Sequence, residues 1–453
     1  MQKNSDFLGT APLGRLMFQL ALPTIAAQLI NMLYNIVDRI YIGHMPEIGD
    51  LALTGVGVCM PLIMVVSAFA ALISAGGAPR ASIFLGQGDH ESAERTMGSC
   101  FSLQVIVSVI LTVVLLLGNR FFLMAFGGSE NTIGFATDYM GIYALGTIFV
   151  QLTLGMNAYI TAQGFSKISM MTVLIGAICN IILDPIFIFG LGLGVRGAAL
   201  ATILSQGISC AWVLKFLTGK KTVLRLQRSR LAIQWKLVLP CIALGLSPFI
   251  MQVTESLIAV CFNSSLLRYG GDVAVGAMTI LTSVMQFAMM PIQGLAQGAQ
   301  PITSYNYGAR NVDRVKKSFR LLLATSLTYS TTIWALIMLF PQVFAGIFTP
   351  DPVLLDFTAG ALRIYCLGLG IFGIQLACQM TFVAIGSALS SILAACMRKL
   401  VLLIPLIFIM PLLMENKTMA VYTAEPVADV LAVAFTATLF AVQFKKALKK
   451  ISE

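Results

Sequence analysis

The amino-acid sequence predicts an all-α integral membrane protein, with twelve transmembrane helices in two pseudo-twofold-related six-helix bundles. Three observations carry this prediction: an apolar composition, long apolar runs and an internal repeat. Of the 453 residues, 58% are hydrophobic and only 11% are charged, whereas a soluble domain carries about a quarter charged residues. Lipid is therefore the predicted solvent of this chain.

The apolar runs have the length and pattern of membrane-spanning helices. They reach about 20 residues without the alternation of apolar and polar residues that barrel strands show. Backbone polar groups in lipid must be satisfied internally, which leaves helices or closed barrels and here favours helices. The predicted spans are 14–42, 53–78, 98–118, 134–160, 168–192, 197–218, 236–265, 273–300, 319–340, 358–382, 391–414 and 425–443.

The basic residues predict the orientation of these spans. An even number of spans puts both termini on one side, together with the Lys- and Arg-rich segments that follow 197–218, 273–300 and 425–443. The positive-inside rule makes this side cytoplasmic, so both termini are expected in the cytoplasm. The opposite loops hold only Arg120, Arg196, Arg268 and Lys417.

Several function classes lack the residues that they need. The net charge of +10 comes mainly from basic residues in the loops on one predicted side of the membrane. The sequence has no separate basic domain that could bind nucleic acid. The nine cysteines lie mostly within spans at no metal-ligand spacing and are interpreted as small apolar residues. The sequence contains no GxxxxGK[ST] motif, so it predicts no ATP site. The sequence therefore predicts no enzyme and no cofactor.

An internal repeat divides the chain into two halves. Shifting the sequence by 222 residues aligns it with itself through most of six spans. Parallel repeats of this kind are one architecture of secondary transporters, which bind substrate between the halves. The predicted units are a lobe at 1–218, a basic cytoplasmic linker at 219–236 and a lobe at 237–453. Matched pairs include Gly86 with Gly308, Gly146 with Gly368, and Gly164 with Gly386.

Acidic residues within the apolar spans are the candidate functional residues. The stretch NIILDPIFIFG places Asp184 one helical turn after Asn180. Charge at a helix centre costs about 2.5–3.5 kcal/mol on insertion scales and marks ion or proton paths. Two acids packed with little water repel each other, so one could hold a proton near neutral pH. Counting from the outer ends of the spans places Asp38, Asp184, Thr202 and Tyr139 in the same outer third of the membrane, and Asn180 points the same way as Asp184 because it lies four residues before it.

The second half does not repeat this polar set, because Leu400 and Ile404 align with its Asn and Asp. Carboxylate, amide and hydroxyl oxygens suit a proton or a small hard cation. A structural alternative stays open, in which Asp38 forms an ion pair with Arg39 or Arg80.

Pro185 follows the acid of the fifth span directly. Inside a helix, a proline frees the carbonyl four residues earlier, here that of Ile181, and favours a kink. Such a bend could couple protonation of the acid to motion, and a static kink stays open as the alternative.

Four stretches resemble the multidrug and toxic compound extrusion (MATE) transporters, over nearly the whole chain. They are LALPTIAAQLINMLYNIVDRIYIG at 20–43, GGAPRASIFLGQGD at 76–89, NIILDPIFIFGLGLGVRGAALAT at 180–202 and QGLAQGAQPITSYNYGARN at 293–311. The resemblance implies two six-helix lobes facing a cleft. It also implies export of bulky, often cationic, amphipathic compounds in exchange for Na⁺ or H⁺. The first-lobe pattern resembles the DinF-like bacterial branch.

The resemblance also implies roles for individual residues. It implies a first-lobe site for the coupling proton or Na⁺ at Asp38, Asn180, Asp184 and Thr202. Substrate or accessory roles are assigned to Tyr34, Tyr139, Gln163 and Glu255. We expect a monomeric antiporter in the bacterial cytoplasmic membrane, with small-molecule drugs or toxic organic cations and the lipid bilayer as its partners. The segment MENKTMAVYTAEP before the last span departs from the glycine-rich family pattern.

Two alternative functions stay open. A lipid-linked oligosaccharide flippase of the same superfamily would carry more cationic residues along its cleft. The candidates for such residues are Arg39, Arg80, Arg363 and Arg398. The other alternative is a channel or membrane scaffold that performs no uphill transport.

Overall fold

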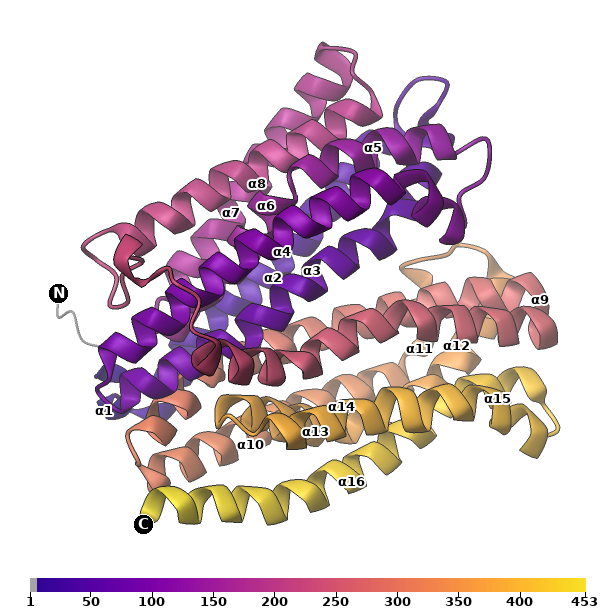
Figure 1. Ribbon diagram of the computed structural model, residues 1–453. Coiled ribbons are helices and arrows are strands. Elements are labelled where there is room, and N and C mark those ends of the chain that lie inside the picture. Colours follow the sequence, from indigo (N-terminus) through magenta and orange to yellow (C-terminus); the bar gives the residue numbers. More distant parts are fainter. Residues whose placement is uncertain (1–5) are drawn as a thin grey trace.

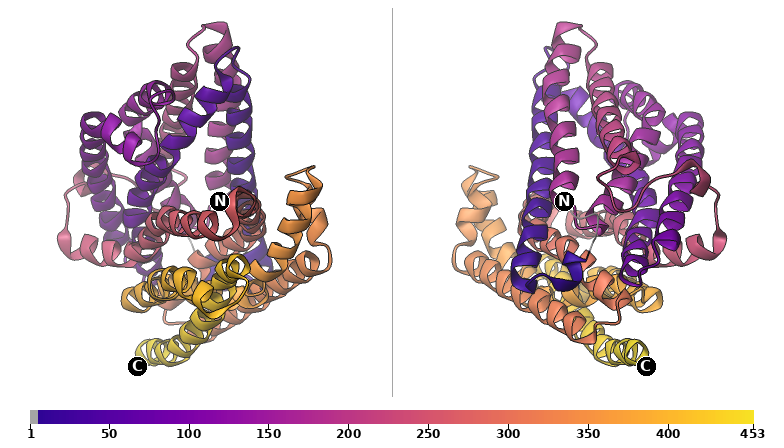
Figure 2. Two further views of the ribbon diagram at one scale, coloured as in Figure 1. Left: turned by 90° about the vertical axis from the view of Figure 1, so that its right-hand side faces the viewer. Right: turned by 90° about the vertical axis from the view of Figure 1, so that its left-hand side faces the viewer.

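The computed structural model describes residues 6–453, and these residues form helices with no strand. Figure 1 shows two helical lobes, one formed by the helices up to residue 218 (indigo to pink) and one by the helices from residue 235 on (rose to yellow). The end views of Figure 2 also show the two lobes as separate layers. We call the end that carries α1 (Phe7–Thr10) and the C-terminus the terminal end, and the opposite end the distal end.

The first lobe contains the helices of the first half of the chain. They are α2 (Leu13–Gly43), α3 (Gly49–Gly86), α4 (His90–Ala125), α5 (Ile133–Leu145), α6 (Thr147–Ala162), α7 (Ser166–Pro185), η1 (Ile186–Gly190) and α8 (Val195–Thr218).

The second lobe follows a short 3₁₀ turn, η2 (Arg228–Arg230), in the connecting segment. Its helices are α9 (Trp235–Gly308), α10 (Val312–Leu339), α11 (Pro341–Gly346), α12 (Pro352–Tyr365), α13 (Leu369–Ala384), α14 (Ala388–Cys396), η3 (Met397–Leu403), α15 (Ile404–Leu413) and α16 (Lys417–Ser452).

The described helices are long and apolar enough to cross a bilayer many times. Nine single helices meet this criterion within residues 6–453, or eleven when each of two bent pairs counts as one span. The 74-residue α9 is broken at Gly271, whose φ of 64° and ψ of −159° are not helical, so α9 holds two segments. The predicted all-helical membrane fold is confirmed, and the number of twelve spans stays a prediction.

The repeat found in the sequence recurs in the backbone. α5 and α6 bend by 56° at Gly146, and α12 and α13 bend by 50° beside Gly368. Gly164 and Gly386 have φ values of 87° and 78°. Glycine adopts positive φ without the strain that a Cβ atom causes, so the aligned glycines provide the same turn in both halves.

At the terminal end, α3 and α9 cross with their backbones in direct contact. A Cβ atom on Gly86 would collide with the carbonyl oxygen of Tyr305, and one on Gly308 would collide with that of Ile83. We call this crossing the glycine seam. Because no side chain separates the two helices there, the seam closes the terminal end of the interface between the lobes.

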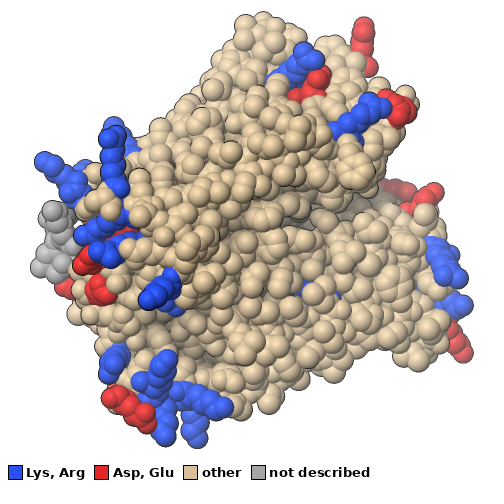
Figure 3. Space-filling view, in the orientation of Figure 1, with Lys and Arg blue, Asp and Glu red and all other residues tan. Residues whose placement is uncertain are grey.

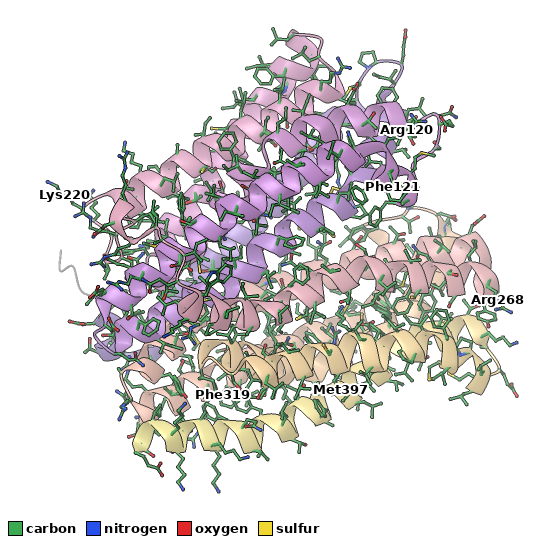
Figure 4. The ribbon with its side chains drawn as sticks, in the orientation of Figure 1. Arg120, Phe121, Lys220, Arg268, Phe319 and Met397 are labelled. Carbon is green, nitrogen blue, oxygen red and sulfur yellow. The ribbon has the colours of Figure 1, made fainter. Side chains whose placement is uncertain are left out.

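The distal end of the interface is open. Figure 3 shows a hollow between the lobes that widens toward this end, whereas Lys and Arg side chains gather at the terminal end. In Figure 4, Lys220 lies at the terminal end, and Arg120 and Arg268 lie at the distal end. This distribution agrees with the two predicted sides of the membrane.

Candidate functional site

Two carboxyl groups of the first lobe lie within hydrogen-bonding reach of each other. They belong to Asp38 on α2 and to Asp184 in the last turn of α7. Asn180 lies one turn before Asp184, and its Nδ2 donates a hydrogen bond of 3.2 Å to Asp184 Oδ1. Asp184 is 0% exposed and Asn180 is 2% exposed. The predicted pairing of acids from separate helices is therefore present in the structure.

Aromatic and hydroxyl side chains surround the two acids. Tyr34, one turn before Asp38 on α2, lies close enough to interact with both carboxyl groups. The hydroxyl of Tyr139 on α5 contacts that of Thr202 on α8. The Thr202 hydroxyl also donates to the carbonyl of Ala198 at 3.0 Å. Four helices of the first lobe thus contribute side chains to one polar cluster.

Three oxygens of this cluster have no hydrogen-bond partner among the described residues. They are Asp38 Oδ1, Asn180 Oδ1 and Asp184 Oδ2, all of them buried. A buried polar atom without a partner costs about 1–3 kcal/mol. A proton shared by the carboxyls would satisfy such oxygens, as would a small cation.

Among the described residues, neither acid forms an ion pair, although Arg39 lies near enough to Asp38 to interact with it electrostatically. Within residues 6–453, Asp38 forms no ion pair with Arg39 or Arg80, so the structural alternative for Asp38 is not observed. The described residues also contain no group of three or more His, Cys, Asp or Glu side chains that could hold a metal ion. An Na⁺ ion would instead need the amide and hydroxyl oxygens of the cluster beside the two carboxylates.

The helix changes its geometry directly after the acid. α7 ends at Pro185, and the chain continues as the π-type turn η1 over Ile186–Gly190. Pro185 lacks the N–H that would bond to the carbonyl of Ile181, so the regular α-helical hydrogen bonding is already interrupted where η1 begins. π-type turns are frequent at functional sites. The sequence predicts a kink at this position, and the structure has a widened turn there.

The second lobe contains a buried charge network at η3. Arg398 Nε donates to Asp429 Oδ1 at 2.8 Å, and its Nη2 donates to Glu425 Oε1 at 3.0 Å. The guanidinium carbon of Arg398 lies 4.6 Å from the centre of the Phe372 ring. In Figure 4, Met397, the residue before Arg398, marks this part of the second lobe. The acids of this network are neutralised by a base, unlike those of the first lobe.

Glu255 also has a basic partner. Lys399 Nζ donates to Glu255 Oε2 at 2.7 Å. The sequence left both a structural and a functional interpretation of Glu255 open, and the ion pair favours the structural one.

Glu425 and Asp429 were not predicted as site residues, because the last span was predicted to begin at 425, which places both acids near its end. α16 begins earlier, at Lys417, and therefore places both acids in a helix interior. Their spacing of four residues, together with an unexplained arginine in the preceding apolar run, was the available signal.

Gln163 does not belong to either polar cluster. Its Oε1 accepts hydrogen bonds from Thr222 Oγ1 at 2.8 Å, from Val223 N at 2.8 Å and from Leu224 N at 2.9 Å. Its amide nitrogen donates to the carbonyl of Tyr159 at 3.0 Å. The side chain therefore fixes the segment that connects the lobes, and its predicted substrate or accessory role has no support in this placement.

A central cavity of about 510 Å³ lies between the lobes. Residues from both halves line it, and the described lining includes no Asp, Glu, Lys or Arg side chain. Its polar groups are amides and hydroxyls, and its apolar groups include two methionines. Representative lining residues are Asn31, Gln252, Gln297, Gln300 and Gln379, with Met251 and Met380.

The two related lobes, the cavity between them and the buried paired acids define a multi-pass membrane transporter. A family model described as MatE matches residues 23–186 and 248–409, and the chain belongs to this family. The predicted resemblance is thereby confirmed. The family consists of transporters and not of enzymes.

Characterised relatives and solved structures cover most of the chain. The multidrug export protein MepA of Staphylococcus haemolyticus is 25% identical over 358 residues, which are 79% of this chain and 78% of that protein. The FAD transporter of Shewanella oneidensis is 25% identical over 419 residues, 89% of each chain.

A crystal structure of MATE in the bent conformation has a TM-score of 0.93 and 22% identity, and covers 100% of both chains. An outward-facing conformation of a multidrug resistance MATE family transporter has a TM-score of 0.91 and 22% identity, and covers 100% of this chain and 99% of that one. These structural matches establish the fold.

Proposed function

We propose that this chain is a secondary active multidrug efflux antiporter, which exports bulky, often cationic, amphipathic compounds in exchange for H⁺ or Na⁺. The observation that carries the proposal is the contact between the Asp38 and Asp184 carboxyl groups, neither of which forms an ion pair with a base among the described residues. The names of the relatives, multidrug export protein above all, support the export of drugs.

The coupling ion acts through charge neutralisation in this proposal. A proton or Na⁺ that enters from the distal side occupies the space between the acids of α2 and α7 and removes their repulsion. Such binding changes the conformational equilibrium only when the ion has different affinities for the two conformations. The π-type turn η1, which follows Asp184 directly, is the element whose geometry would change with ion binding.

The central cavity is the proposed substrate site. Its amides and hydroxyls offer both donors and acceptors, and Met251 and Met380 adapt their shape to different apolar surfaces. Recognition in this conformation therefore depends on hydrogen bonds and packing, not on a fixed countercharge.

The residues that line the central cavity do not favour the alternative function as a lipid-linked oligosaccharide flippase. A pyrophosphate-linked lipid needs cationic side chains, and none of the four candidate arginines lines the cavity among the described residues.

The proposed cellular setting follows the charge distribution. The terminal end, rich in Lys and Arg, faces the cytoplasm, so both termini are cytoplasmic in a bacterial inner membrane. We further propose that a monomer is the working unit. Residues 1–218 and 237–453 act as the two moving lobes, and 219–236 acts as the linker.

Reconstituted vesicles test the proposal. The purified chain is placed in proteoliposomes with a fluorescent organic cation, and Na⁺ and pH gradients are imposed separately. One of the gradients should drive dye accumulation, and Asp38→Asn and Asp184→Asn should each reduce its rate at least tenfold.

Asp138→Asn is the matched control, because Asp138 is an acid of the same lobe in an exposed ion pair with Arg196 at 3.0 Å. Full gradient-driven transport by either buried-site variant contradicts the mechanism. Transport without any gradient dependence contradicts antiport.

A further inference from the structure

A second cavity lies between the lobes at the terminal end. It has a volume of about 450 Å³ and is separate from the central cavity, with which it shares no lining residue. The first lobe contributes Arg80 from α3 and Gln87, which directly follows α3, whereas the second lobe contributes Ser387 and, from α16, Lys446 and Lys450. We call it the terminal-end cavity.

The charge of this cavity is unbalanced. Three cationic side chains line it, and no Asp or Glu is among the described lining residues. Arg80 Nε is buried and has no hydrogen-bond partner in the described part of the chain. Lys446 and Lys450 form no ion pair there either. Lys446 and Lys450 are exposed, so solvent screens part of their charge, and an anion between them and Arg80 would lower the remaining repulsion.

The neutral lining adds hydrogen-bond donors. Tyr307 and Ser387 carry hydroxyl groups, and Gln87 carries an amide. Guanidinium, ammonium, hydroxyl and amide donors around one space are the groups that bind phosphate oxygens, with arginine suited to bidentate contacts. The volume also falls within the range of about 300–1,000 Å³ that small-molecule sites occupy.

We propose that the terminal-end cavity binds a phosphate-bearing anion, either the headgroup of an anionic lipid or a free phosphate compound. The bound anion bridges the two lobes, because Arg80 belongs to the first lobe and both lysines belong to the second. Gln87 directly follows Gly86 of the glycine seam, so the anion lies beside the contact that closes the terminal end. Binding therefore stabilises the conformation that is open at the distal end.

The effect on drug export rests on the proposed function, whereas anion binding does not. The first test is therefore a binding measurement on the purified full-length chain in neutral detergent. Thermal unfolding is followed while inorganic phosphate, short-chain phosphatidylglycerol or short-chain phosphatidylcholine is added. We expect phosphate or phosphatidylglycerol at about ten times its Kd to raise the Tm by roughly 1.5 °C, and phosphatidylcholine to have little effect.

The double variant Lys446→Gln/Lys450→Gln should weaken the apparent affinity at least tenfold. Lys445→Gln/Lys449→Gln is the matched control, because it removes the same charge from the same helix at positions that do not line the cavity. An effect of phosphatidylglycerol alone identifies a lipid headgroup, and an effect of both probes identifies phosphate chemistry from either source.

Two results overturn the proposal. One is a wild-type chain whose Tm responds to neither anion, and the other is an equal loss of response in the cavity variant and in the control variant. Asp38→Asn should retain the full response, because Asp38 does not line the cavity. An Asp38→Asn chain that loses transport but binds the anion shows that the two proposals stand or fall separately.

Discussion

Lys399 Nζ lies 2.7 Å from Glu255 Oε2, so an intramembrane acid of the second lobe has its own base within hydrogen-bonding distance. In the first lobe, Asp38 and Asp184 contact each other and have no such base among the described residues. The two halves of the repeat therefore differ in whether their intramembrane acids form ion pairs. An acid without a fixed countercharge can exchange its ion, whereas a paired acid is held by its partner.

The ion pair in the second lobe predicts a stability effect that depends on both partners. Glu255→Gln should lower the free energy of unfolding by roughly 2 kcal/mol, because it leaves the buried Lys399 ammonium group without its partner. Lys399→Met should lower it less, because the Glu255 side chain is 59% exposed. The double variant should lose less than the sum of the single losses. Thermal unfolding of all four proteins in detergent measures this coupling, and strictly additive losses would show that the contact contributes nothing.

Asn180 predicts an effect on coupling. Asn180→Leu removes the 3.2 Å hydrogen bond to Asp184 and one of the unpartnered oxygens of the cluster. A hydrogen bond to a charged group contributes about 1.5–3 kcal/mol, so the apparent affinity for the coupling ion should fall by roughly tenfold or more. Gradient-driven dye transport at varied ion concentrations measures this shift. An unchanged ion dependence would exclude Asn180 from the site.

The glycine seam predicts a change of conformation. In Gly308→Ala, the new Cβ atom meets the backbone carbonyl of Ile83, so α3 and α9 must separate at the terminal end. Spin-label distances between the lobes at that end should lengthen. Gly276→Ala in the same helix is the control, because its Cβ atom would lie 3.7 Å from its nearest neighbour, Leu354 Cδ1. Equal distances in the two variants would contradict a role of the seam in closure.

Two helix caps at aligned positions predict different responses to pH. Asp89 accepts a hydrogen bond from Ser92 N at 2.9 Å at the start of α4, and Asn311 accepts one from Arg314 N at 3.1 Å at the start of α10. The contacts of Asp89 with Ser92 lower the pKa of its carboxyl group below the ordinary value. The charge-dependent part of this stabilisation is therefore complete above the unfolded pKa of about 3.9. It is lost as the pH falls through the lower folded pKa.

Replacement by alanine at either cap should lower the free energy of unfolding by about 1 kcal/mol at neutral pH. For Asp89→Ala, the difference from wild type should shrink as the pH falls below about 4. For Asn311→Ala it should stay constant, because an amide does not titrate. Denaturant unfolding from pH 7 to pH 3 compares the two caps, and parallel pH curves would contradict the assignment.

Local spacing allowed the first-lobe cluster to be predicted from the sequence. Asn180 and Asp184 are four residues apart, which places them on one face of a helix. Counting residues from the outer ends of the predicted spans then placed Asp38 at the same depth in the membrane as Asp184. Both arguments depend on regular helix geometry, and the structure preserves that geometry up to Pro185.

The second-lobe network could not be predicted in the same way. Arg398 meets Asp429 across 31 residues, and such a contact depends on how two helices pack against each other. The predicted start of the last span also hid its partner Glu425. Gln163 is an error of the opposite kind, because the sequence predicted a role for a residue that does not belong to the site. It was predicted to have a substrate or accessory role, but its side-chain oxygen accepts hydrogen bonds from the backbone of the segment that connects the lobes.

The glycine seam has a consequence for the energetics of switching. Where a lobe junction consists of interlocked side chains, parting it uncovers much apolar surface and is opposed by the hydrophobic effect. Here Gly86 and Gly308 bring main chain against main chain, so parting the helices uncovers no side chain at these two positions, and the hydrophobic cost comes from neighbours in the same core cluster, such as Leu85 of α3 and Ile302 of α9. In the proposed transport cycle, the coupling ion shifts the conformational equilibrium only by the difference in its affinity for the two conformations, and a change from 1:99 to 99:1 takes about 5.5 kcal/mol of such differential binding.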